Sequence, residues 1–95
     1  MNFNDLSKLM VAYKLSPSEA RVVAYLSEHE CVTQFELAVV LGKKAKAEEN
    51  WGAFNNSLRV MIFKIRKKVG NDVIDNLWGM GYRLVPDDKM LEVLK

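Results

Sequence analysis

The spacing of apolar residues predicts a short helix near the start of the chain. After Asn2 and Asn4, apolar residues recur at helical spacing, which predicts a helix over roughly residues 4 to 13: Phe3, Leu6, Met10 and Tyr13, with Leu9. We therefore expect an amphipathic helix here, with this apolar side toward the core.

Two further helices begin with the same cap signature. In Ser16-Pro17-Ser18-Glu19 the serine can accept from the exposed amide of the third helical residue, the glutamate can reach back to the cap, and proline at the first helical position loses no hydrogen bond. Thr33-Gln34-Phe35-Glu36 repeats the capping box. We expect the first of these helices to run to about His29 and the second to stop at Gly42, so that they form a tight pair.

A third helix of this core is expected to end before Gly70, with Asn55 or Asn56 as its cap. The polar stretch before it, Lys43 to Asn50, predicts either a loop or a broken helix. On a wheel that turns about 100° per residue, four apolar residues of the third helix fall within about 60° of one another and form a buried stripe: Leu58, Ile62, Ile65 and Val69. The opposite side presents Asn56, Arg59, Val60, Phe63, Lys64 and Lys67, with Arg66 at its border.

The last third of the chain predicts a β-hairpin. Residues Val73 to Leu77 and Tyr82 to Val85 have the composition of short strands, and Gly79-Met80-Gly81 supplies the permissive backbone of the turn. Tyr82 and Leu84 are expected in the core. For Trp78, packing of the hairpin against the third helix is favoured, and contact with the surface of a partner stays open as the alternative.

Together these elements predict a mainly α fold with a small β-hairpin. Asp87 is expected to cap a last short helix, so that short terminal helices flank a three-helix core. A chain of 95 residues holds one such domain, and 49% hydrophobic with 27% charged residues excludes a disordered chain. No stretch approaches the roughly 20 apolar residues that span a bilayer, so we expect a cytoplasmic protein that does not enter a membrane.

Candidate catalytic chemistry is not visible in the sequence. The single Cys31 and single His29 cannot build a zinc site from several such ligands, and no phosphate-binding glycine loop or nucleophile elbow occurs. We therefore expect a protein that is not an enzyme and needs no cofactor.

Charge is distributed unevenly along the chain. The segment from Lys43 to Lys68 has eight basic and two acidic residues, a net +6, whereas the remainder has six basic and ten acidic residues, a net −4. The overall +2 therefore conceals a basic segment that can attract a polyanion.

Three separated motifs carry a specific resemblance. The run from Ile62 to Gly70, followed by Leu77-Trp78-Gly79-Met80-Gly81-Tyr82-Arg83-Leu84, resembles the effector domain of OmpR/PhoB-type response regulators, and Leu15 to Glu19 resembles the opening of its first helix. The resemblance covers roughly residues 15 to 86. It implies a winged helix-turn-helix that regulates bacterial or phage transcription, with the third helix in the major groove of double-stranded DNA and the hairpin beside it.

The resemblance also implies roles for particular residues. The groove-facing positions of the helix are Arg59, Val60, Phe63, Lys64, Arg66 and Lys67, flanked by Asn56. On the hairpin, Asn76 stands at a phosphate-contacting position, Trp78 at the wing tip, and Arg83 on the second strand. The segment Gly42 to Phe54 is where the family can contact RNA polymerase, and Lys43, Lys44, Lys46 and Trp51 are the candidates for a partner there.

The sequence departs from the family at its start. Residues 1 to 14 are expected to form a helix in place of the family's N-terminal sheet, followed by the winged helix over residues 15 to 86 and a short helix over residues 87 to 95. A receiver domain is not expected within this polypeptide, so we expect no control by aspartate phosphorylation within it.

Two alternatives stay open. Val60 and Phe63, apolar residues between basic side chains, suit a winged-helix module that binds a transcription factor or RNA polymerase as well as they suit a DNA groove. The terminal helices could pair two copies of the chain or simply cap the core. DNA bound through about four to six phosphates predicts a log–log salt slope near −4 to −5, and an apolar protein interface predicts far less sensitivity.

Overall fold

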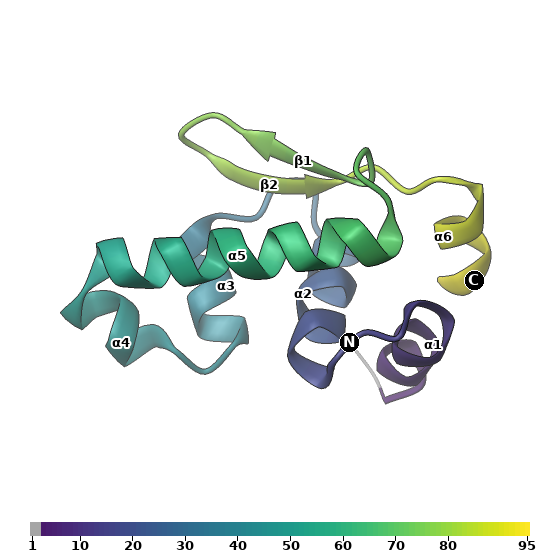
Figure 1. The fold of residues 1–95 in the computed structure, drawn as a ribbon, viewed down its shortest axis with the longest axis horizontal. Helices are drawn as coiled ribbons and strands as arrows, with labels where there is room; N and C mark the ends of the chain where they lie inside the picture. The colour runs from purple at the N-terminus through teal and green to yellow at the C-terminus, as the bar shows by residue number, and fades with distance from the viewer. Residues whose placement is uncertain (1–2) are drawn as a thin grey trace.

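The computed structural model describes residues 3–95 and is mainly helical, with one antiparallel hairpin. The long helix α5 crosses the molecule, α2 and α3 lie behind it, the hairpin runs along one edge, and α1 and α6 group at one end (Figure 1). The elements are α1 (Phe3–Tyr13), α2 (Pro17–Glu28), α3 (Gln34–Val40), α4 (Lys44–Glu49), α5 (Trp51–Val69), β1 (Ile74–Leu77), β2 (Gly81–Leu84) and α6 (Asp88–Val93).

Both predicted capping boxes are confirmed. The Ser16 hydroxyl accepts from the Glu19 amide at 3.2 Å, and the Ser16 amide donates to the Glu19 carboxylate at 2.8 Å. Thr33 and Glu36 make the same reciprocal pair at the start of α3. A hydrogen bond of 3.0 Å from the Tyr25 hydroxyl to the Glu36 carboxylate then joins α2 to α3. The caps therefore fix where α2 and α3 begin, and the Tyr25–Glu36 bond adds a tie between two helices that share the core.

The predicted start of the long helix was wrong. α5 begins at Trp51, one turn before Asn55, and Asn50 caps it by accepting from the Ala53 amide at 3.1 Å. The polar stretch before it forms α4, so the alternative of a broken helix is confirmed. Burial of Ala47 and Phe54 on either side of the break holds both helices against the core. The predicted stripe Leu58, Ile62, Ile65 and Val69 is buried throughout.

The hairpin register pairs Ile74 with Leu84 and Leu77 with Gly81. Tyr82 also exchanges two backbone hydrogen bonds of 2.8 and 2.9 Å with Val32, in the segment between α2 and α3. This bridge ties the hairpin to the helix pair. Tyr82 is buried and Leu84 is partly buried against the core, as expected.

The terminal helices close one end of the core. Leu9 and Tyr13 of α1 and Met90 of α6 are buried, and Asp87 caps α6 by accepting from the Met90 amide at 2.9 Å. The alternative that these helices cap the core is thus confirmed, whereas pairing of two copies through them stays a prediction. Among the helices of residues 3–95, none is both long and apolar enough to cross a membrane.

Candidate nucleic-acid interface

One side of α5 is exposed along most of its length. The exposed residues opposite the buried stripe fall into two rows with a four-residue step, and together we call them the α5 face: Asn56, Val60 and Lys64 in one row, Arg59, Phe63 and Lys67 in the other. At about 1.5 Å per residue the face extends about 17 Å along the helix. All six residues predicted for this side are therefore brought together.

The α5 face is positively charged, and no acidic residue occurs anywhere in α5. Within the described part of the chain, no salt bridge engages Arg59, Lys64 or Lys67. The Lys67 ammonium lies 4.6 Å from the centre of the Phe63 ring, a cation–π contact that holds the two side chains together. Three cations are thus available to an anionic partner.

Arg66 lies between α5 and the hairpin rather than on the α5 face. Its Nε and Nη2 donate to the Ile74 carbonyl oxygen at 3.1 and 2.8 Å. This carbonyl is on the outer edge of β1, since β1 pairs with β2 on its other side. Arg66 therefore fixes the start of the hairpin against the last turns of α5, and two of its donors are not available to DNA.

We expect Arg66→Ala to reduce the free energy of unfolding by about 1.5–3 kcal/mol, because two hydrogen bonds from a charged donor group are lost and the partly buried Ile74 carbonyl loses its partner. Arg66→Lys should recover only part of this loss, since an ammonium cannot reproduce the two-pronged contact. Urea unfolding measures the stability. If Arg66→Ala instead leaves the stability unchanged and makes the salt slope of DNA binding shallower, the guanidinium contacts phosphates and does not hold the hairpin.

Lys68 also makes its contacts within the fold. Its ammonium lies 2.8 Å from the buried Glu19 carboxylate and donates to the Lys14 carbonyl at 3.1 Å. Burial raises the pKa of the Glu19 carboxyl, but the hydrogen bonds from Lys68 and Ser16 outweigh burial and leave its pKa below the ordinary value. The pair joins the last turn of α5 to the first turn of α2, away from the α5 face.

The hairpin places Asn76 and Arg83, both predicted to contact DNA, on opposite sides. Side chains alternate along a strand, so Asn76, opposite Tyr82 in the register, shares the Tyr82 side of the hairpin, whereas Arg83 lies on the other side. Arg83 pairs with Asp75 at 2.7 Å across the two strands. Asn76 is exposed and its side chain is available to a partner on that side, whereas the Arg83 charge is balanced on the opposite side.

The expectation that Trp78 packs against α5 was wrong. Trp78 stands at the hairpin turn and is 98% exposed, and Met80 beside it is 60% exposed. Sequence reasoning did not select Met80 as a site residue. The signal for it was its place between Gly79 and Gly81, since a residue at the tip of a two-stranded turn has no neighbouring layer to pack on.

The predicted partner-binding segment contains α4 and the first turn of α5, in agreement with the broken-helix alternative. Lys44 makes a loose pair with Glu48 at 3.9 Å on α4, whereas Lys43 and Lys46 border an open hollow of about 340 Å³ between α4 and the first turns of α5. Trp51 is 44% exposed, with its ring 5.9 Å from that of Phe54. A contact with RNA polymerase through this segment stays a prediction.

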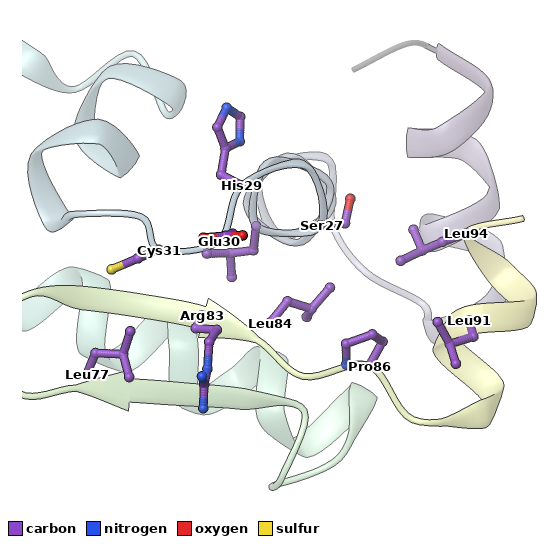
Figure 2. A pocket seen from close by; sticks show the side chains of 11 residues that line it. Ser27, His29, Glu30, Cys31, Leu77, Arg83, Leu84, Pro86, Leu91 and Leu94 are labelled. Atoms are coloured by element: carbon purple, nitrogen blue, oxygen red, sulfur yellow. The ribbon is translucent and has the colours of Figure 1, made fainter.

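A second hollow, of about 560 Å³, lies between the end of α2, the hairpin and α6. Figure 2 shows Cys31 and Arg83 toward one end of it, with Leu91 and Leu94 toward the other. None of its lining residues comes from α5, so it is separate from the α5 face. Among residues 3–95, no group of three or more potential metal ligands is assembled.

Comparisons with protein-family models, curated proteins and solved structures found no match to this chain.

Proposed function

We propose that the protein is a winged helix-turn-helix regulator that binds double-stranded DNA in a sequence-specific manner. In this proposal α2 and α3 support the recognition helix α5, which enters the major groove, and the hairpin is the wing beside it. The order of elements agrees with this assignment, and two contacts hold the parts together: the bridge between Val32 and Tyr82 joins the hairpin to the helix pair, and Arg66 joins it to α5.

The observation that carries the proposal is the composition of the α5 face. Among residues 3–95 its three cations have no salt bridge to an acidic side chain, and they share an exposed side with an amide and two apolar residues. Lysine and arginine neutralise phosphates, arginine and asparagine can read guanine and adenine edges, and Val60 or Phe63 can contact thymine methyl groups. A helix of about 10–12 Å diameter fits the major groove.

A specific observation favours a second candidate function, a winged-helix module that binds a protein. Val60 and Phe63 are 54% and 57% exposed at the centre of the α5 face. Apolar side chains at the centre of a patch with a polar rim are common in protein interfaces. The α5 face would then bind a transcription factor or RNA polymerase.

The salt dependence of binding separates the two functions. The three available cations of α5 predict that the logarithm of the DNA association constant falls with log salt at a slope of about −2.7 or steeper, at roughly −0.9 per phosphate. Fluorescence anisotropy of a labelled random duplex measures this slope, and selection from a random duplex library at moderate salt tests specificity. If no duplex binds and no motif is enriched, the second function is favoured, in which the α5 face binds a protein.

A further inference from the structure

Helix α1 presents a ridge on the side that faces away from the core. Leu9 and Tyr13 are buried in the core, whereas Val11, on the opposite side of the helix, is 82% exposed. Ser7 lies one turn before Val11, and these two residues form a row with a four-residue step, which we call the α1 ridge. The ridge lies at the end of the molecule where α1 and α6 group (Figure 1).

A hollow runs along each side of the α1 ridge. One, of about 520 Å³, lies between α1 and α6, and the other, of about 410 Å³, lies between α1 and α2. Both expose mainly apolar atoms. A ridge bounded by grooves is the surface through which helices pack on one another. We call the first hollow the α1–α6 groove, and its lining residues are Ser7, Lys8, Val11, Ala12, Glu92 and Val93.

The rim of the α1–α6 groove has one charge of each sign. Lys8 donates to the Lys95 carbonyl at 2.8 Å, and an ammonium has three donors, so its charge is still available. Glu92 pairs with the Lys95 ammonium at 3.4 Å, but both side chains are exposed, so this pair is weak. The hollow between α1 and α2 has a single charged residue, Arg21. A rim with both signs matches a second copy of itself, because a two-fold axis can place each charge opposite the other sign.

We propose that two copies of this chain pair through α1 about a two-fold axis, with the α1 ridge of each copy in the α1–α6 groove of the other. Lys8 of one copy then faces Glu92 of the other, and the symmetry makes this contact twice. The apolar contact of Val11 supplies most of the affinity, and the charges at the rim fix the orientation. Ser7 and Ala12 have small side chains, which allows the two helices to approach closely.

Pairing through α1 leaves the α5 face of each copy exposed, because no lining residue of the α1–α6 groove belongs to α5. A pair that binds DNA as proposed above would contact two inverted half-sites. This consequence rests on the proposed function, whereas the pairing itself does not. Self-association is measured without DNA, so failure of the pairing and failure of DNA binding are distinguishable.

The mass in solution tests the pairing. An 11-residue helix is about 16 Å long, so the interface is small and we expect a dissociation constant on the order of 10–100 µM. In sedimentation velocity between about 5 and 500 µM, the mass should rise from that of one chain toward that of two. The mass of one chain over the whole range would overturn the proposal and leave the α1 ridge to a different protein.

Val11→Gln should abolish this rise in mass without disturbing the fold, because Val11 is exposed and glutamine has a high helix propensity. Val39→Gln is the matched control, since Val39 is 52% exposed on α3 and does not line the groove. It should associate like the wild type. Equal loss of association in both variants would mean that exposed apolar surface in general, and not the α1 ridge, joins the copies.

Charge reversal tests the contact between Lys8 and Glu92. Lys8→Glu or Glu92→Lys alone gives the rim a single sign, so each variant should associate roughly 10-fold more weakly than the wild type. An equimolar mixture of the two variants should recover the association, because each charge then faces the opposite sign across the interface. If the mixture associates no better than the single variants, the two-fold contact between these residues is refuted.

Discussion

Gly81→Ala is expected to destabilise the protein by about 3–4 kcal/mol, a large part of the stability of a domain of this size. Gly81 has a φ of +138°, a conformation that side-chain-bearing residues rarely adopt. A Cβ atom there would collide with the Val32 carbonyl oxygen and lie 2.7 Å from the Val32 carbonyl carbon and 2.8 Å from the Thr33 Cα. Because these are backbone atoms, relief would require the bridge between Val32 and Tyr82 to open.

Gly79→Ala provides the matched control. Gly79 also has a positive φ, +70°, but a Cβ there would meet no heavy atom within 4 Å. Its cost is the conformational penalty alone, about 1–2 kcal/mol. Guanidinium unfolding of the two variants and the wild type measures the difference, and equal destabilisation at both positions would mean that the close approach of Val32 does not constrain Gly81.

This geometry gives a physical reason for the Gly-x-Gly-Tyr pattern that led to the family resemblance. Gly81 permits the hairpin to approach the segment between α2 and α3, and Tyr82 then makes the backbone bridge and fills the core. Gly79 serves only the turn. The two glycines of the motif therefore have different roles, which the sequence pattern alone does not separate.

The elements that were predicted well depend on chemistry within a few residues. Ser16, Thr33 and Asp87 each cap a helix through a partner three residues away, so the sequence contains both members of the interaction. The buried stripe of α5 follows in the same way from helical spacing. The start of α5 was missed because Gly52 and two later asparagines resemble a loop, whereas burial of Phe54 and Ala47, a tertiary effect, extends the helix to Trp51.

Interactions between distant segments could not be predicted from local patterns. Lys68 pairs with Glu19, 49 residues away, and nothing local in the sequence indicates this partner. Arg66 donates to a backbone carbonyl, and every residue has one, so the sequence does not identify the acceptor. Both belong to the basic segment identified from composition. Its +6 charge thus overestimates the charge offered to a partner, because two of the five cations of α5 hold the fold together.

The remaining three cations give the prediction with the largest effect on function. Arg59→Gln, Lys64→Gln and Lys67→Gln together should weaken DNA binding about 500-fold at 0.1 M salt, because each lost phosphate contact removes about 0.9 from the salt slope. The loss should shrink as salt rises and nearly vanish near 1 M, where counterion release no longer favours the wild type. Glutamine has a high helix propensity, so α5 should remain helical in this variant.

A triple variant with the same change in net charge tests whether position matters. Lys8, Arg21 and Lys95 are exposed on α1, α2 and the C-terminus, and their replacement by glutamine removes three positive charges away from the α5 face. If long-range attraction by net charge dominates, the two triple variants lose affinity equally. If α5 contacts the phosphates, the control retains a slope close to that of the wild type, while the α5 variant loses about 2.7. Anisotropy titrations over a range of salt concentrations distinguish these outcomes, because a contact changes the slope and a distant charge within a screened solution does not.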